Sequence, residues 1–248
     1  MNVKDFENDF EQTLVLIKPD ALKNSLTGYV LSQLSEFHTG LRFAGTKIVH
    51  VSRMLAEEHY AEHRGKAFFN AIIEYIMGIS HYPASPQKQR VIAIVYRGLD
   101  AVRKVRDIAG PTNPHDAREQ RPGCIRSLGA LVPVKNDKGE TISRMDNLIH
   151  ASANQIDAER EVKLWFKPED IPPYMRMYPT RESEDHFYFK GKHLYRQHEP
   201  GSACLLAPGD CAWDTDLEAL KLLIEDKSSP ITLESIVAKY LINKTGEY

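Results

Sequence analysis

The stretch "TLVLIKPDAL", residues 13–22, carries the first strand pattern of the chain. From Thr13 to Lys18, β-branched and apolar side chains dominate without polar alternation, and Pro19 then stops the run. A strand with both faces buried has this pattern, because neither face meets water. The pattern therefore predicts a buried strand over residues 13–18. It leaves Lys18 at the strand end, where open sheets meet ligands, although a solvated lysine at a strand terminus has the same pattern.

Three further strand patterns and five helical patterns follow this strand. The strands are expected over residues 43–54, 90–98 and 147–151, and the helices over residues 27–37, 55–65, 66–78, 99–110 and 154–166. Residues 110–129 are rich in Pro, Asn and Gly, which predicts a loop. The order of these elements predicts an α+β fold of the ferredoxin-like (split βαβ) type. In that fold an antiparallel four-stranded sheet carries helices, here expected on one face.

The chain changes character after Phe166. Residues 167–210 are rich in Pro, Tyr and charged side chains and show no long periodic helix. Two amphipathic patterns then follow, over residues 215–226, where Thr215 and Glu218 predict a capping box, and over residues 232–241. We therefore expect two domains: residues 1–167, and a small, mostly helical C-terminal extension, 168–248, that ends in a helical pair. The extension is expected to build an assembly contact, or to cover the sheet or loop region around residues 78–90, and to supply no catalytic group.

Composition narrows the class of protein. The 248 residues are 42% hydrophobic and 27% charged, which is typical of a globular protein, and the net charge of −2 gives no basic field for nucleic acid. Three cysteines argue against a disulfide framework and for a reducing compartment. The acidic N-terminus does not have the pattern of a signal peptide, and no apolar run approaches the ~18 residues of a membrane span. We expect a cytoplasmic protein without membrane or nucleic-acid partners.

Three features could carry chemistry, and each is ambiguous alone. Lys18 ends the first strand, a run of arginines surrounds Thr112 between residues 102 and 126, and His150 ends the pattern "DNLIH". Arginine forks with a hydroxyl can clamp a phosphate, whereas a solvated basic loop has the same composition. A lone histidine is more often structural. The sequence contains neither GxxxxGK[ST] nor GxGxxG, so it indicates neither a P-loop nor a Rossmann site.

Taken together and in order, these features resemble the nucleoside diphosphate kinase family. The resemblance rests on colinear motifs from Thr13 to Glu169: "TLVLIKPDAL", "EEHYAEHRGKAFF", "VRDIAGPTNP", "RPGCIR", "NLIH" and "AEREVKLWFKPE". It implies the ferredoxin-like fold. It also implies transfer of the γ-phosphate of ATP or another nucleoside triphosphate to a nucleoside diphosphate through a phosphohistidine.

The resemblance also implies roles for individual residues. His150 matches the nucleophile, Glu161 the carboxylate that orients it, Tyr60 the tyrosine beside it, and Lys18 the lysine at the transferred phosphate and sugar hydroxyl. The nucleotide-binding positions match Phe68 for base stacking, Arg106, Thr112 and Arg126 for the phosphate clamp, and Asn147 for the ribose. No protein metal site is implied, because Mg²⁺ would arrive with the nucleotide phosphates. Nucleoside di- and triphosphates are the expected partners, together with further copies of the chain in a homo-oligomer.

Some segments depart from the family pattern. Ala151 and Ala153 replace a glycine and an aspartate after the histidine, and residues 78–90 and 126–147 are longer than usual. The longer second segment contains a hairpin-like stretch, residues 134–141, and Arg144 is the candidate for a position near the base that is usually small and aliphatic. These departures leave a second hypothesis open, a catalytically weak nucleotide-binding or regulatory module. His59 is expected to be structural, and the spacings of His193, His198, Cys204 and Cys211 disfavour a zinc site.

Overall fold

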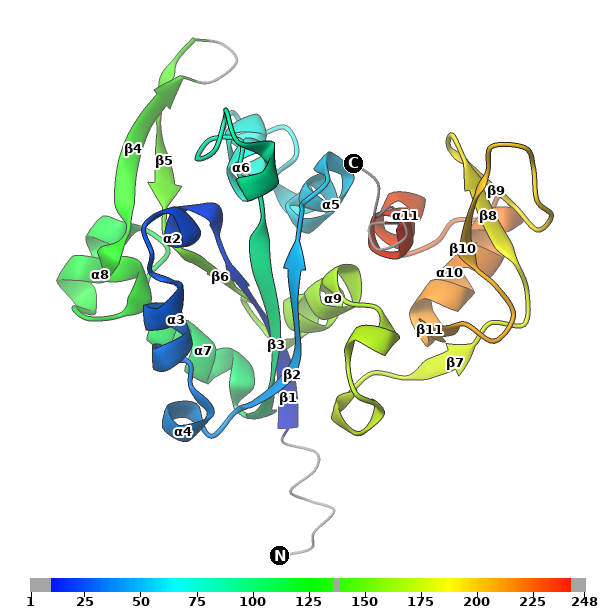
Figure 1. The fold of residues 1–248 in the computed structure, drawn as a ribbon, viewed down its shortest axis with the longest axis horizontal. Helices are drawn as coiled ribbons and strands as arrows, with labels where there is room; N and C mark the ends of the chain where they lie inside the picture. Colours follow the sequence, from blue (N-terminus) through cyan, green and yellow to red (C-terminus); the bar gives the residue numbers. More distant parts are fainter. Residues whose placement is uncertain (1–9, 136–138, 242–248) are drawn as a thin grey trace, which may run out of the picture. The chain divides into compact units, whose positions relative to one another are not determined.

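A computed structural model describes residues 10–135 and 139–241 (Figure 1). They form two compact units that divide between Val162 and Lys163. The first unit contains the four-stranded sheet, and the second contains five short strands and the two C-terminal helices. This division lies five residues before the boundary expected from composition. That residues 1–167 and 168–248 act as separate functional domains stays a prediction.

The sheet of the first unit has the expected ferredoxin-like topology. Its strands are β1 (Phe10–Ile17), β2 (Arg42–Val49), β3 (Val91–Leu99) and β6 (Ile149–Ala151), in the order β2-β3-β1-β6 with all neighbours antiparallel. The predicted fold class is therefore confirmed. The short β6 pairs with β1 so that His150 lies opposite Leu16. This pairing places His150 at the end of the sheet where β1 leads into Lys18.

Both faces of β1 are buried, which explains its continuous apolar sequence. Val15 and Ile17 belong to a core cluster with residues of α3 and α7, while Leu14 and Leu16 on the opposite face are equally inaccessible. Figure 1 shows α3 and α7 on one side of the sheet and α5 on the other. The expectation of helices on one face alone is therefore wrong. A strand covered on one face would alternate polar and apolar residues.

Several helix boundaries differ from those predicted. The helices of the first unit are α2 (Pro19–Lys23), α3 (Thr27–Gln33), α4 (Glu36–Thr39), α5 (Arg53–His59), α6 (Phe69–Ile76), α7 (Ala101–Ala109), α8 (Pro114–Gln120) and α9 (Gln155–Trp165), which runs into the second unit. Short 3₁₀ turns are η1 (Ala61–His63), η2 (Pro86–Lys88) and η3 (Ile125–Leu128). Ser52 caps α5, so the second strand ends earlier than expected. Asn113 caps α8 within the segment expected to be a loop.

The longer second segment forms a β-hairpin, as its sequence indicates. Strands β4 (Ala130–Lys135) and β5 (Thr141–Asp146) pair antiparallel over six residue pairs, from Ala130 opposite Asp146 to Lys135 opposite Thr141. The hairpin is joined to the sheet through Asn147 and Leu148, immediately before β6. It therefore places β5 next to the segment that carries His150.

The second unit contains more strand than its sequence indicates. After the 3₁₀ turns η4 (Pro168–Asp170) and η5 (Pro173–Met175) come β7 (Thr180–Glu182), β8 (Phe187–Lys190), β9 (His193–Tyr195), β10 (Ala203–Leu206) and β11 (Cys211–Trp213). They form two small sheets, β10-β8-β9 and β11-β7. Helices α10 (Asp214–Ile224) and α11 (Leu233–Leu241) pack on each other and on β9, β10 and β11. The apolar faces of the helical pair are thus covered within this unit.

A buried ion pair joins the two C-terminal helices. Lys239 Nζ donates to Asp216 and to the backbone oxygen of Lys163, and the Tyr240 hydroxyl donates to Asp216 Oδ2 over 3.0 Å. The predicted capping box at Thr215 is wrong, because α10 begins at Asp214 and no side chain caps it. Starting the helix at Asp214 puts Thr215 inside the first turn, where it cannot act as a cap.

Candidate active site

One cavity of about 390 Å³ in the first unit collects all nine residues singled out from the sequence. It is lined by Lys18, Tyr60, Phe68, Arg106, Thr112, Arg126, Asn147, His150 and Glu161, which come from six different parts of the chain. A common cavity shows that these side chains can act on one ligand. It does not by itself assign a role to any of them.

The centre of the cavity is an ordered histidine. His150 Nε2 lies 2.8 Å from Glu161 Oε2, and the Ser152 hydroxyl donates to the same oxygen over 2.7 Å. Ser152 in turn accepts from the backbone N–H of Leu14 on β1. The imidazole is therefore held against the sheet on one side and against α9 on the other. Ser152, which follows β6, is a positioning residue that the motif contains but whose contacts the sequence did not indicate.

The charge state of Glu161 determines which nitrogen of His150 can react. Burial alone would raise the pKa of Glu161, but the charge and hydrogen bond of His150, together with His59 and Ser152, lower it to about 2. At neutral pH the carboxylate is thus ionised and accepts hydrogen bonds only. A neutral His150 must then carry its proton on Nε2. Its Nδ1 keeps a free lone pair and is the nitrogen available for attack.

An unusual backbone conformation places the neighbours of His150. Leu148 has a φ of 69°, the left-handed region that non-glycine residues rarely adopt. Its N–H donates to Asp20 Oδ2 over 2.9 Å, and its carbonyl oxygen accepts from the N–H of Lys18 over 2.9 Å. These two bonds tie the start of β6 to the end of β1. As a result, Asn147 is brought beside Lys18.

Lys18 is a buried cation at the wall of the cavity. Its Nζ donates to Asn147 Oδ1 over 2.7 Å and lies 5.1 Å from the centre of the Tyr75 ring. Burial, and then the charge of Arg126, lower the pKa of Lys18 to about 7, against the opposing effects of Asp20 and Asp146. Burial disfavours the charged form of Lys18, and an anion that enters the cavity would therefore stabilise the ammonium. The solvated-lysine interpretation therefore does not hold, because only 5% of Lys18 is exposed.

Two arginines face the cavity near Lys18. Arg126 is buried, and its guanidinium donates to the backbone oxygens of Gly110 over 2.8 Å and Ile149 over 3.3 Å. Burial, followed by the charge of Arg106, lowers the pKa of Arg126 to about 10. Like charges brought together in this way form a site for an anion, and phosphate fits the arginine fork.

Gly110 makes the position of Arg126 possible. Its φ of +81° favours glycine, and a Cβ at this residue would lie 2.2 Å from Cys124 Sγ. Without that close approach, the segment after α7 could not return to deliver Arg126 to the Gly110 carbonyl. Thr112 follows in the same segment, and its backbone oxygen accepts from Asn147 Nδ2 over 2.9 Å.

The other basic residues of the arginine-rich stretch do not line the cavity. Arg103 pairs with Asp100, Arg121 pairs with Asp107, and Lys104 donates to the Thr39 carbonyl. Arg118 donates to the carbonyls of the loop before β4, at Ser127 and Gly129. Only Arg106 and Arg126 of this set contribute to the cavity. The solvated-loop interpretation is thus correct for part of the stretch and wrong for the rest.

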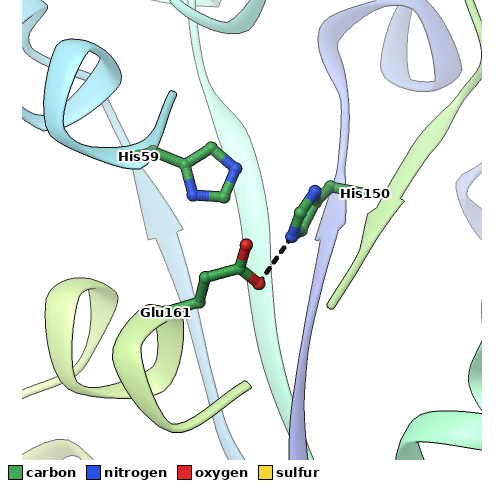
Figure 2. Close-up of side chains that lie close together, drawn as sticks. All are labelled: His59, His150 and Glu161. Atoms are coloured by element: carbon green, nitrogen blue, oxygen red, sulfur yellow. Dashed lines mark hydrogen bonds and ion pairs between the residues drawn. The ribbon is translucent and has the colours of Figure 1, made fainter. Parts of the chain in front are cut away.

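His59 lies closer to the site than its sequence context indicates. Its ring centre is 4.5 Å from that of His150 in an edge-to-face arrangement, and 4.5 Å from that of Tyr60. Figure 2 shows His59 and Glu161 both directed toward His150, from α5 and α9. Burial, then the charge of His150, lower the pKa of His59 well below its ordinary value. A neutral His59 packs against His150 without adding a positive charge beside it.

Within residues 10–135 and 139–241, these same three side chains are close enough together to hold a metal ion. The donor atoms of His59, His150 and Glu161 lie within 4.8 Å of one another. Two imidazoles and one carboxylate suit a transition metal, whereas Mg²⁺ prefers oxygen ligands. Arg160 Nη2 already lies 3.5 Å from Glu161 Oε1. The trio therefore does not fit magnesium.

Tyr60 and Phe68 line the cavity in different ways. Tyr60 is buried and its hydroxyl has no partner among the described residues, and burial raises its pKa. Phe68 is 41% exposed at the start of α6. Tyr75 is a neighbour that the sequence analysis missed, and its hydroxyl accepts from the N–H of Asn147 over 3.3 Å. The signal was present, because Phe68, Ile72 and Tyr75 recur at i, i+4 and i+7.

A histidine with a fixed tautomer, beside two arginines and a buried lysine, is suited to phosphoryl transfer. Comparison with known proteins assigns the chain to a family. The model of the family "Nucleoside diphosphate kinase" matches residues 11–171. The chain belongs to the nucleoside diphosphate kinase family, and the resemblance found in its motifs is confirmed.

Individual relatives support this assignment. The nucleoside diphosphate kinase of Pyrococcus abyssi is 39% identical over 185 residues, which are 75% of this chain and 98% of the relative. That of Pyrococcus furiosus is 42% identical over 169 residues, 68% and 91% of the two chains. A solved structure from Borrelia burgdorferi, a transition-state mimic with bound vanadate and ADP, is 30% identical with a TM-score of 0.52. The match covers 68% of this chain and 94% of the Borrelia burgdorferi chain.

Across residues 10–135 and 139–241, every helix is too short or too polar to cross a membrane.

Proposed function

We propose that this protein transfers the γ-phosphate of a nucleoside triphosphate to a nucleoside diphosphate through a phosphohistidine at His150. The observation that carries the proposal is the contact of His150 Nε2 with the ionised Glu161, which leaves Nδ1 free to attack. Covalent relay divides one transfer into two in-line steps, each with a single nucleotide in the site.

In the first step, Nδ1 of His150 forms a bond to the γ-phosphorus of the nucleoside triphosphate. The bond between the γ-phosphorus and the β,γ-bridging oxygen breaks, and the nucleoside diphosphate leaves. The resulting phosphohistidine keeps its proton on Nε2, where Glu161 stabilises the positive ring. In the second step, a terminal oxygen of the acceptor diphosphate attacks the same phosphorus and the P–N bond breaks. His150 regains its lone pair, so no external acid, base or water is consumed.

The cationic residues act on the transferred group in both steps. Arg126 and Arg106 hold the phosphates, and Lys18 contributes a charge that an arriving phosphate stabilises. Asn147, held by Lys18 and Thr112, presents its amide to the sugar. Preorganised donors of this kind are stronger in a site that excludes water. Mg²⁺ enters the proposal only with the nucleotide, chelated by its phosphates, where it supplies charge neutralisation.

The experiment is phosphoenzyme formation with γ-labelled ATP. The protein should acquire label that is stable in base and labile in acid, and a nucleoside diphosphate should discharge it. His150→Ala should abolish both label and transfer while circular dichroism shows an unchanged fold. His115→Ala, which removes an exposed histidine on α8, is the matched control and should label normally.

The alternative, a catalytically weak nucleotide-binding module, makes the opposite prediction. A protein of that kind would bind nucleotide and acquire no label. Separately, unchanged labelling of the His150→Ala variant would contradict the assignment of His150 as the nucleophile. No feature of the site favours this alternative, since every cavity position that handles phosphate carries a suitable side chain. Assembly into a homo-oligomer and location in the cytoplasm stay predictions, and a solution mass measurement tests the first.

A further inference from the structure

The two segments that depart from the family pattern meet at one cluster of charges. Arg144 and Asp146 lie on β5 of the hairpin, and His81 belongs to the longer segment after α6. Arg144 Nε donates to Asp146 Oδ1 over 2.6 Å, and Arg144 Nη2 donates to Asp146 Oδ2 over 3.0 Å. His81 Nε2 lies 2.8 Å from the same Oδ2. The bidentate contact fixes the plane of the guanidinium.

This cluster faces the nucleotide cavity. The Arg144 side chain is only 14% exposed, lines the cavity, and has its guanidinium carbon 5.8 Å from the centre of the Tyr75 ring. The Tyr75 ring also lies near Lys18, so it joins the cluster to the phosphate-handling residues. A side chain this ordered at a cavity wall presents a fixed surface to whatever enters.

Arg144 differs from the arginines of the clamp in its partners. Arg126 contacts two neutral carbonyl oxygens and keeps its full charge, whereas Arg144 is paired with a carboxylate. Pairing with Asp146 reduces the attraction of Arg144 for a phosphate. The flat face of its guanidinium still stacks on aromatic rings. Arg144 is therefore better suited to an aromatic ligand group than to an anion.

The cavity that Arg144 lines also carries a set of apolar side chains, beside the polar Glu62, His63 and Ser143. On the α6 side it is lined by Phe68, Ala71 and Ile72, and on the hairpin side by Ile142 and Met145. The charged groups that bind phosphate, Lys18 with the two clamp arginines, gather near His150. With the phosphates of a nucleotide at those groups, these apolar side chains are available to its base.

We propose that Arg144 is a specificity-determining residue whose guanidinium plane stacks on the nucleobase, in the same cavity as Phe68. Asp146 and His81 act as positioning residues that hold the plane. The proposal rests on the proposed function and names the base contact of that same site. Because stacking grows with ring size, purine nucleotides should depend on Arg144 more than pyrimidine nucleotides do. The two longer segments thereby give this chain a rigid planar cation at the base.

The test compares Arg144→Val, which removes the plane, with Arg144→Lys, which keeps only the charge. Both should raise KM for GDP by ~5- to 30-fold and for CDP by less, with kcat changed little, as expected for loss of one base-stacking contact. Lys88→Gln in η2 removes an exposed cation outside this cavity and should leave both constants unchanged. Removing Arg144 leaves the Asp146 carboxylate with His81 as its remaining side-chain partner among the described residues, so Arg144→Val/Asp146→Asn provides a second, better balanced variant.

Binding measured by calorimetry without turnover separates the outcomes. The affinity for ADP should fall in the Arg144 variants, while the affinity for inorganic tripolyphosphate, which lacks a base, should not. An equal loss for tripolyphosphate, or a fall in kcat at constant KM, would assign Arg144 to the phosphates and overturn the proposal. Unchanged KM values in a folded variant would also overturn it. Failure of the proposed function is distinct, since it appears as missing His150 label in the unaltered protein.

Discussion

The two ends of the cavity are built on different principles. At the histidine end, His150, Glu161 and Ser152 are held by β1, β6 and α9, and the charges nearby point toward one incoming anion. At the hairpin end, Arg144 is already paired with Asp146, and the cavity also carries apolar side chains from α6 and β5. We therefore expect the histidine end, with its unneutralised charges, to hold the reacting phosphate. We expect the hairpin end, where Arg144 is paired, to recognise the base. Substitutions at the first end should change kcat, and those at the second should change KM.

Among substitutions that keep the histidine, the largest effect is expected from the clamp. Arg126→Lys keeps the charge but cannot reach both the Gly110 and Ile149 carbonyls while facing a phosphate. Transition-state stabilisation should fall by about 2–4 kcal/mol, seen as a loss of kcat/KM. Arg106→Lys should change in the same direction. Arg121→Lys, on the same stretch but paired with Asp107 outside the cavity, is the matched control. Unchanged kinetics in both clamp variants would return these arginines to the solvated surface.

A smaller effect is expected from Glu161→Gln. The amide oxygen can still accept from His150 and Ser152, so the tautomer is kept, but the charge that stabilises the phosphorylated ring is lost. Loss of such an orienting partner typically costs ~10–100-fold, and here the loss should appear in kcat. Asp157→Asn, in the first turn of the same helix, should be nearly silent. If Glu161→Gln raised KM for base-bearing substrates instead, the division between the two ends would fail.

The smallest effect is a pH dependence. Because burial lowers the pKa of Lys18 to about 7, the free protein loses this positive charge as the pH rises above that value. The kcat/KM profile should then fall by about tenfold per pH unit on its alkaline side. Bound phosphates stabilise the ammonium, so the same fall in kcat should occur at higher pH. Lys18→Met should be weaker at all pH values and lack this limb, and a wild-type profile flat to pH 9 would contradict the assignment.

The sequence was informative where local chemistry matches local structure. The continuous apolar pattern of residues 13–18 reflects a strand with both faces covered, and at the ends of the hairpin-like stretch β4 pairs with β5, with Lys135 opposite Thr141. Prediction was weaker where a short polar cap starts a helix, as Asn113 does for α8. It was weakest in the second unit, whose strands of three or four residues are too short to show a period.

For the site, the resemblance of the motifs implied which residues would handle the phosphate, and histidine, lysine and arginine suit the chemistry of phosphoryl transfer. They did not indicate that Ser152 would fix Glu161 or that His59 would lie against His150. Those contacts arise between residues far apart in the chain, and no local pattern encodes them.

The sequence alone thus determined the family, the fold of the first unit and the set of side chains that are proposed to handle phosphate. Only the tertiary structure decided which nitrogen of His150 is available, since that depends on the ionised Glu161 brought to it by α9. It also decided that Arg144 and His81, 63 residues apart, meet at Asp146 beside the cavity. Charge and tautomer are set by distance and burial, and these are properties of the packed chain rather than of its order.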